Sequence, residues 1–434
     1  MPKTIRETHI KKLLVRLHGK EVGALELADG RPFFTYSREW LATRIELSPR
    51  NWPLRPEPYR AVETAVEWGL PGFIADSLPD AFGKEIMLRH FAEKGLLNPT
   101  PLDLLAVVGE RGMGALTYRP AADDTPLDSP AEAIDAIQLG RLAREAEAVV
   151  AHLETGKISP VLLREGSSIG GARPKMRLCI GRDGKFYGST SPEAEMPGAS
   201  HWIVKFDAVN SGWGCVELAY SYMARAAGID APESRIIRAR RDDGVELRNF
   251  AIRRFDRVGA ERVHYHSAAG YYNRSIQPPN MVQGDYGELL AALGELGAPA
   301  KDREEMLRRC IFNVLACVFD DHFKNTGFCM TPEGRWRLSP AFDLCYCDPA
   351  LQWVRTLGRC SLVNGRSRDI RQADVLALCP AANIPQRKGR QIIGQVAAAV
   401  GEWARFSGEA DVPTERLEQI RSNLESVKTG FFAR

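Results

Sequence analysis

The chain has 434 residues, of which 44% are hydrophobic and 26% charged, and its formal net charge is +3. This is the profile of a globular protein, and the length suggests two or three domains of roughly 100–200 residues each. The near balance of 58 basic and 55 acidic residues neither demands nor excludes nucleic acid. A dedicated DNA-binding protein usually carries a clearer basic excess.

The cysteines and the first residues bear on the cellular compartment. The nine cysteines are an odd number and form no C-x-x-C pair, which favours reduced, buried thiols over a disulfide framework. The start, MPKTIRETHIKKLLVRLHG, is charged and lacks the apolar core of a signal peptide. No run of about 18 apolar residues predicts a membrane span. We therefore expect a cytoplasmic protein with no membrane partner.

The first part of the chain combines strand-like and helix-like patterns. Residues 12–38 alternate apolar and polar side chains between turn signals, which predicts a small antiparallel sheet. Residues 60–96 are helical in pattern, and Thr100 precedes a proline that opens another short helix. The acidic, proline-containing stretch AADDTPLDSPAEA then indicates a linker. We predict a first domain over 1–122.

The middle of the chain changes character twice. A helix is expected over about 132–155, followed by VLLREG as a strand and by a Gly/Ser-rich loop at 166–171. The segments KMRLCI and HWIVKFD predict further strands, and a helix with an apolar stripe comes next. The strand at 248–257 is suited to be a hinge between lobes. We place one unit over 123–257 and a mostly helical unit over 258–434, which ends in two amphipathic helices.

The stretch 302–343 is expected to be the chemical centre. Asp302 is a plausible N-cap of a buried helix, with Glu305 completing a capping-box pattern. The helix runs into the polar cluster DDHFKN, and GFCM, a Pro-Glu-Gly turn and RWRL then predict a β-hairpin. The hairpin should return the chain so that Asp343 lies near Asn325.

The polar features follow one another in the order of parts in a protein-kinase-like phosphotransferase. Phosphoryl transfer concentrates negative charge, so it needs cations, hard oxygen ligands for Mg²⁺ and an ionised base beside the acceptor hydroxyl. Each feature alone has an ordinary structural explanation, such as a flexible loop, a snorkelling lysine, a solvated glutamate or a turn aspartate. The order therefore carries the inference: the loop at 166–171, Lys205, Glu217, the hinge strand, Asp320-x-x-x-x-Asn325 and Asp343.

Nearly end to end, the sequence resembles the HipA toxin kinases of bacterial HipBA toxin–antitoxin modules. The residues that carry the resemblance are HGKEVGALEL, SLPDAFG and LLAVVGERGMGAL in the first domain, and SSIGGARPKMRL, HWIVKF, ELAYSYMARAAGI, RRFDR, DDHFKN and LSPAFDL after it. The resemblance implies an α+β fold: an N-terminal α/β subdomain followed by a bilobal, protein-kinase-like domain with a largely helical C-lobe. It also implies ATP and Mg²⁺ as cofactors.

The resemblance assigns roles by position. Asp320 is similar to the catalytic base, and Asn325 and Asp343 to the magnesium ligands. The expected ATP-binding residues are Ser168, Gly170, Gly171, Lys175, Lys205, Glu217 and Phe255, of which Phe255 lies in the hinge where backbone groups would meet adenine.

Some assignments stay open on the sequence alone. Ser168 matches the family's autophosphorylated loop serine, with Ser167 as the second choice. The resemblance implies that a phosphate on this serine displaces the loop and switches the kinase off, as the added charge would do in a packed turn. Asp321 competes with Asp320 as the base, although the spacing to Asn325 favours Asp320.

We expect a protein serine/threonine kinase toxin that phosphorylates a protein substrate, such as an aminoacyl-tRNA synthetase, and itself. The resemblance implies a HipB-like helix-turn-helix antitoxin as partner, and operator DNA bound mainly through that antitoxin. Two alternatives remain: a small-molecule kinase of the aminoglycoside-phosphotransferase type, and a degenerate kinase acting as a co-repressor.

Overall fold

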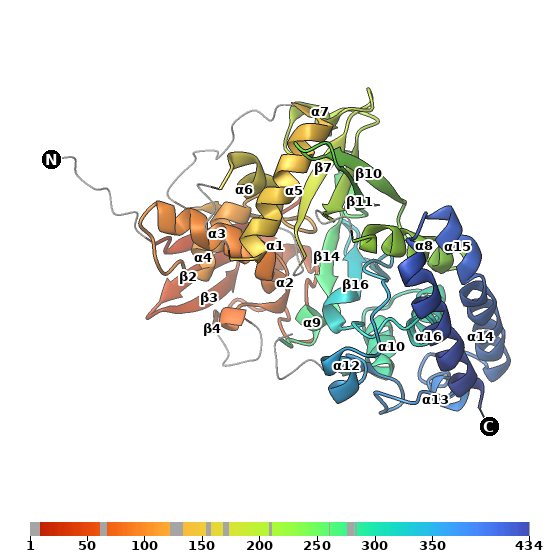
Figure 1. Ribbon diagram of the computed structural model, residues 1–434. Coiled ribbons are helices and arrows are strands. Elements are labelled where there is room, and N and C mark those ends of the chain that lie inside the picture. The colour runs from red at the N-terminus through yellow and green to blue at the C-terminus, as the bar shows by residue number, and fades with distance from the viewer. Residues whose placement is uncertain are drawn as a thin grey trace.

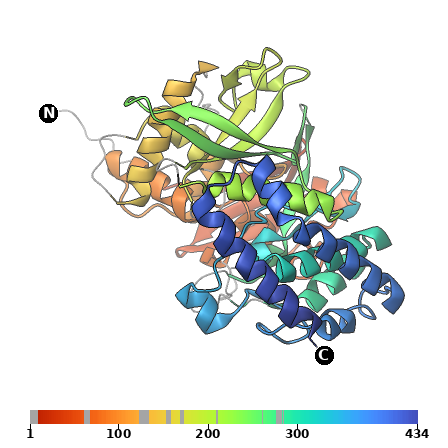
Figure 2. The ribbon, with the colours of Figure 1, turned by 45° about the vertical axis from the view of Figure 1, so that its right-hand side comes forward.

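A computed structural model describes residues 9–60, 67–121, 133–152, 158–167, 173–207, 211–259, 261–275, 282 and 284–433. The N-terminal elements, red and orange in Figure 1, lie beside both the yellow-green strands and the green-to-blue helical part. A view turned by 45° shows the same arrangement, with the C-terminal helices grouped on one side of the molecule (Figure 2). The fold is mixed helix and sheet, and the predicted linker over AADDTPLDSPAEA lies mainly outside the described residues.

The N-terminal part is an antiparallel sheet covered by short helices. Its five strands have the order β4-β3-β2-β1-β5, and alternate residues of β1 and β3 are buried, which confirms the sheet predicted from the alternation over 12–38. The strands are β1 (Lys12–Leu17), β2 (Lys20–Ala28), β3 (Arg31–Tyr36), β4 (Tyr59–Arg60) and β5 (Leu116–Pro120).

The helical prediction over 60–96 was only partly right. A strand ends at Arg60, and the apolar residues after Gly69 form one short and one longer helix separated by Leu78-Pro79, because proline cannot continue a helix. The prediction at Thr100 is confirmed: its Oγ1 accepts from Asp103 N in a capping box. The helices are α1 (Arg38–Thr43), η1 (Glu67–Gly69), α2 (Gly72–Ala75), α3 (Ala81–Glu93) and α4 (Pro101–Val108).

A six-stranded sheet in the order β10-β11-β9-β7-β8-β6 forms the second layer. In its middle, Lys175 of β7 lies opposite Lys205 of β9, which in turn lies opposite Phe250 of β11. The strands are β6 (Ala133–Ile134), β7 (Lys175–Ile180), β8 (Phe186–Tyr187), β9 (Ser200–Lys205), β10 (Ser234–Arg240) and β11 (Glu246–Arg253). Its helices are α5 (Ala136–Val150), α6 (Pro160–Gly166), α7 (Pro192–Glu195) and α8 (Trp213–Ala226).

The segment VLLREG is a helix, so its prediction as a strand was wrong. Ser159 caps α6 by accepting from Leu162 N at 3.2 Å, and Pro160 occupies the first turn, where its missing N–H costs nothing. A run of three apolar residues has no clear period, and the cap was the informative signal. The helix over 132–155 is confirmed in type, but it ends at Val150.

The C-terminal part is helical around a three-stranded sheet, β14-β16-β17, which contains the predicted hairpin, and it also holds the two-stranded sheets β12-β13 and β15-β18. Three helices rather than two fill the end of the chain. The strands are β12 (Arg257–Val258), β13 (Glu261–Arg262), β14 (His264–Ser267), β15 (Gly284–Asp285), β16 (Gly327–Met330), β17 (Trp336–Leu338) and β18 (Ser361–Leu362). The helices are α9 (Ala268–Tyr271), α10 (Tyr286–Glu295), α11 (Ala300–Leu315), η2 (Phe323–Asn325), α12 (Gln352–Leu357), α13 (Gln372–Ala377), α14 (Gln386–Gly401), α15 (Trp403–Glu409) and α16 (Thr414–Phe432).

Two apolar clusters each join residues from different parts of the chain. Phe82 and Ile86 of α3 are buried in the same apolar cluster as Trp202 and Val204 of the six-stranded sheet. A second cluster joins the N-terminal sheet to the C-terminal helices. The predicted limits at 122 and 257 stay a prediction. None of the helices in the described part of the chain has the length and apolar character that crossing a membrane requires.

Candidate active site

Lys205 is the centre of the site. Its Nζ forms ion pairs with the carboxylates of Glu217, on α8, and Asp343, after the hairpin. Glu217 was expected to be solvated on its position alone, but its side chain is only 3% exposed. Burial opposes the charge of Lys205, yet Asp343 and Glu217 outweigh burial and raise the pKa of Lys205. The three residues expected at the phosphates and the metal therefore meet.

A second cation lies directly across the sheet. Lys175 is the register partner of Lys205, so the two side chains leave neighbouring strands on the same face. Lys175 is buried, and burial, with the like charge of Lys205, lowers its pKa to about 8. An anion between the two lysines would relieve their repulsion, so the pair would suit a polyanion.

Asp343 is placed by the hairpin and by an unusual backbone conformation. The hairpin closes where Ser339 N donates to Gly327 O at 2.9 Å, which returns the chain as predicted. Asp343 has a φ of 58°, a left-handed conformation that aspartate tolerates better than most residues. Burial alone would raise the pKa of Asp343, but Lys205 and Lys175 outweigh it and hold the pKa well below its usual range.

Asp302 has a different role from the one predicted. Helix α11 begins at Ala300, and its N-cap is Pro299 rather than Asp302. Asp302 therefore lies inside the first turn. Its buried carboxylate accepts from Arg337 Nε at 2.8 Å, Arg337 Nη2 at 3.0 Å and Leu338 N at 2.8 Å. Asp302 thus fastens strand β17 to the helix. A capping pattern cannot reveal such a partner 35 residues away.

The two adjacent aspartates face different surroundings. Asp321 is buried and accepts from Arg359 at 3.0 and 2.9 Å, from Tyr286 at 2.8 Å and from Ser361 N at 3.1 Å. The Asp320 side chain is 51% exposed. Partial burial raises the pKa of Asp320, and Asp343 adds to the rise. Of the two, Asp320 is available to a substrate.

Asn325 and Asp343 have the donor atoms that Mg²⁺ prefers, namely an amide and a carboxylate oxygen. Asn325 Nδ2 donates to the Asp320 carbonyl at 2.9 Å, which fixes the amide and leaves its Oδ1 for a ligand. The low pKa of Asp343 keeps its carboxylate ionised. No group of three or more His, Cys, Asp and Glu side chains that could hold a metal ion occurs among the described residues. By their donor atoms, Asn325 and Asp343 would suit a magnesium ion that takes its other ligands from phosphate and water.

Phe255 lies in the connection between the six-stranded sheet and β14. Its ring centroid is 5.8 Å from those of Tyr265 and Phe342, so it packs against the residue before Asp343. Arg253, at the end of β11, pairs with Glu233 at 3.5 Å and lies near the surface. The connection therefore packs against the segment that carries Asp343.

The predicted loop residues Ser168, Gly170 and Gly171 lie outside the described residues. Ser167, the second choice for autophosphorylation, is the C-cap of α6 and is fully buried. Its Oγ has no hydrogen-bond partner within the described part of the chain. A Cβ at Gly83 of α3 would lie 2.5 Å from the carbonyl oxygen of Ser167, so the N-terminal part contacts the start of this loop closely.

Comparisons with known families place the sequence. A model of the HipA N-terminal domain matches residues 13–119, and a model of the HipA-like C-terminal domain matches residues 167–404, more than half of the chain. The chain belongs to the HipA family. The predicted family and fold class are therefore confirmed.

HipA relatives cover most of this chain. Protein Y4dM of Sinorhizobium fredii is 28% identical over 353 residues, 78% of each chain. The serine/threonine-protein kinase toxin HipA of Shewanella oneidensis is 24% identical over 336 residues, 72% of this chain and 69% of that protein. In the solved complex of Shewanella oneidensis HipA, HipB and operator DNA, one chain matches with a TM-score of 0.70, 17% identity and coverage of 96% and 97%. That likeness supports the HipA fold.

Sequence reasoning missed one contribution to this HipA site. Asp80, in the motif SLPDAFG of the N-terminal part, pairs with Lys324 of the loop DDHFKN at 2.6 Å. Asp76 Oδ2 accepts from Ser267 N at 2.7 Å. The Nδ1 atom of His266 lies 2.7 Å from the same oxygen. The motif was noticed as a family signature, but nothing in its pattern indicates a partner more than 190 residues away.

Proposed function

We propose that this HipA-family chain is a protein serine/threonine kinase and the toxin of a toxin–antitoxin module. The observation that carries the proposal is the double ion pair of Lys205 with Glu217 and Asp343. It joins the sheet, helix α8 and the metal-ligand position as phosphoryl transfer requires. The relative from Shewanella oneidensis that is named a serine/threonine-protein kinase toxin supports the same activity.

The residues divide the work between binding and proton transfer. Bound Mg-ATP would supply the phosphoryl group and the cation that neutralises the developing charge. Lys205 and Lys175 would bind the phosphate oxygens, and Glu217 would hold Lys205 in place. Asn325 Oδ1 and Asp343 would hold the metal. The backbone beside Phe255 would meet the adenine.

Asp320 is the proposed general base. In the transfer, a bond forms between the acceptor hydroxyl oxygen and the γ-phosphorus, the bond to the bridging oxygen breaks, and the hydroxyl proton passes to the Asp320 carboxylate. The raised pKa of Asp320 brings its basicity closer to that of a useful base at neutral pH. Asp321 lacks this role because its oxygens are already engaged by Arg359, Tyr286 and Ser361.

The regulation and the partners of this chain are proposed from those of the HipA family. We propose Ser168 as the site of autophosphorylation, with Ser167 as the alternative. The burial of Ser167 against α3 favours its neighbour, because a doubly charged phosphate does not fit a fully buried position. A HipB-like helix-turn-helix antitoxin is the proposed partner, and we propose that operator DNA is reached mainly through it. The solved Shewanella oneidensis complex, which contains HipA, HipB and operator DNA, supports these partners.

The test is to incubate the purified chain with ³²P-labelled ATP, Mg²⁺ and a bacterial lysate, and to map the phosphosites. The proposal expects label on Ser168 and on a protein of the translation apparatus, such as an aminoacyl-tRNA synthetase, and none when Mg²⁺ is chelated. Label only on a small molecule would make the chain a small-molecule kinase. The absence of both Mg-ATP binding and transfer would leave a co-repressor without kinase activity.

A further inference from the structure

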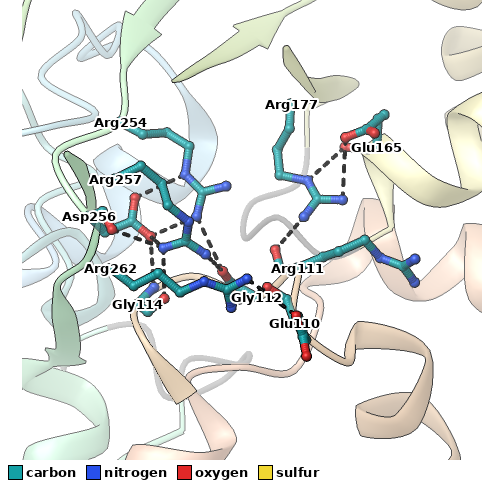
Figure 3. A network of polar contacts seen from close by, with 10 residues as sticks. All are labelled: Glu110, Arg111, Gly112, Gly114, Glu165, Arg177, Arg254, Asp256, Arg257 and Arg262. Atoms are coloured by element: carbon teal, nitrogen blue, oxygen red, sulfur yellow. Dashed lines mark hydrogen bonds and ion pairs between the residues drawn. The ribbon is translucent and has the colours of Figure 1, made fainter. Parts of the chain in front are cut away.

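Three arginines from the hinge and the short β12-β13 ribbon converge on one loop of the N-terminal part (Figure 3). The loop, residues 110–114, connects α4 to β5 and presents its backbone carbonyls to these side chains. Arg254 donates to Gly112 O at 3.2 Å, Arg257 donates to Gly112 O at 3.0 Å and to Gly114 O at 2.7 Å, and Arg262 donates to Glu110 O at 2.7 Å. We call residues 110–114 the clamp loop.

Asp256 is the acidic centre of this arrangement. It is fully buried, and its carboxylate accepts from Arg254 at 2.9 and 2.6 Å, from Arg257 at 2.7 Å and from Gly114 N at 2.8 Å. Burial by itself would raise the pKa of Asp256, but the two arginines outweigh burial and hold it well below its usual range. The charge of Asp256 therefore holds both arginines and the clamp loop together.

The network holds the residues on both sides of Phe255, whose backbone is the proposed adenine contact. Arg254 and Asp256 flank Phe255 in sequence, so both neighbours of the hinge residue are fastened to the clamp loop. On the other side, Arg254 N donates to His201 O on β9 at 2.7 Å, which ties the same residue to the sheet that carries Lys205. The direction of the backbone at Phe255 is thus set from the N-terminal part and from the sheet together.

A second branch reaches the strand that carries Lys175. Arg177, two residues along β7 and only 2% exposed, donates to the carbonyls of Arg111 and Arg164 and lies 3.5 Å from the Glu165 carboxylate. Arg164 and Glu165 lie in the last turn of α6, and Ser167 follows after Gly166. The clamp loop therefore contacts both the hinge and the strand behind the serine loop.

We propose that the clamp loop is a functional part of the nucleotide site, and that Asp256 is a positioning residue that sets the hinge for adenine. This inference rests on the proposed kinase function and adds the base-selecting role of the N-terminal part. Asp256 does not touch the nucleotide; it acts through the backbone of Phe255. A rigid hinge matters because a hydrogen-bonding site rejects the wrong base only when its donors and acceptors are fixed in place.

The test is the preference of the full-length chain for Mg-ATP over Mg-GTP, measured as the ratio of the two dissociation constants by titration calorimetry. Wild type is expected to prefer ATP, and Asp256→Asn should reduce the preference about tenfold, the usual scale for a residue that acts without touching the ligand. The ratio does not depend on the fraction of folded protein, so a loss of stability alone leaves it unchanged.

Two further variants complete the design. Arg257→Lys keeps the charge but loses the fork that reaches two carbonyls, and we expect a loss of preference of about threefold. Glu246→Gln is the matched control. It removes the carboxylate of an exposed ion pair with Arg238 on the six-stranded sheet, and it should leave the ratio of dissociation constants unchanged.

Hydrogen–deuterium exchange on the same proteins follows the network directly. In Asp256→Asn, the peptides that cover 109–115 and 250–258 should exchange faster together, while the peptide of α11 keeps its wild-type rate. If wild type prefers ATP and Asp256→Asn keeps the same preference, this inference alone is overturned. Equal binding of ATP and GTP by wild type would also overturn this inference alone. A wild-type chain that binds neither nucleotide would overturn the proposed function as well.

Discussion

Arg359 holds the carboxylate of Asp321 in the interior, with its Nε and Nη2 at 3.0 and 2.9 Å from the same oxygen. Both side chains are 2% exposed or less. Asp321 is anchored inward in this way, whereas the side chain of the preceding residue, Asp320, is half-exposed, and the charge of Asp343 helps to raise its pKa. One buried ion pair therefore separates an anchoring aspartate from a chemically available one.

Replacing Asp321 should damage the fold more than the replacement of its neighbour. In Asp321→Asn the charge of Arg359 stays buried without a counter-ion, and removing one partner of a buried pair usually costs about 3–5 kcal/mol in the free energy of unfolding. Urea unfolding followed by tryptophan fluorescence measures the loss, with Asp320→Asn as the matched variant, expected within about 0.5 kcal/mol of wild type. Equal stability of the two variants would contradict the division of roles.

Lys175 predicts a pH dependence of stability. Its pKa is lowered to about 8 from an ordinary 10.5, so between these values the unfolded chain binds more protons and stability rises with pH. Below pH 8 the buried Lys175 is charged in the folded chain, so the cost of burying that charge lowers the free energy of unfolding in full. Lys175→Met should therefore be more stable than wild type at pH 7, by on the order of 1–3 kcal/mol, and this advantage should vanish as the pH rises toward 10.5. Unfolding curves of both proteins from pH 7 to 10.5 measure it, and an advantage that grows with pH would refute the account.

The ion pair of Asp80 with Lys324 predicts a catalytic effect from the N-terminal part. The two side chains are partly exposed, at 34% for Lys324 and 26% for Asp80, so the loss of the pair should change stability by no more than about 1 kcal/mol. Its place beside Asn325 should matter more, because a small displacement of the loop misplaces the reacting groups. Asp80→Asn is expected to lower kcat about tenfold with little change in KM for ATP. The matched control is Glu26→Gln, which breaks the exposed Lys12–Glu26 pair in the same part. A kcat equal to that of the control would reject the coupling.

The sequence was most informative where chemistry and short-range pattern coincide. The hairpin and the strands around Lys175 and Lys205 were predicted from strand-like patterns and turn residues, and the helix with Glu217 was predicted from its apolar stripe. The structure brings Lys175, Lys205 and Glu217 together. Residues on paired strands with the right turns can meet in only a few ways, which is why their order along the chain was enough.

The sequence was least informative where partners come from distant segments. The links from Asp302 to Arg337, from Asp80 to Lys324 and from Asp256 to the clamp loop join residues whose own patterns suggest capping or solvent exposure. Helix α6 was missed for another reason: its apolar run is too short to have a period. Tertiary contacts, rather than local propensity, decide such positions.

The central claim is that Asp320 is the base of a Mg-ATP-dependent protein kinase. It is tested most directly by the rate of ³²P transfer from labelled ATP to Ser168 and to lysate proteins in wild type and Asp320→Asn, at equal concentrations of folded protein. The account predicts Mg²⁺-dependent transfer by wild type and a fall of at least ~10²-fold in the variant, the scale of a positioned acid–base group. Transfer by Asp320→Asn at the wild-type rate would contradict it.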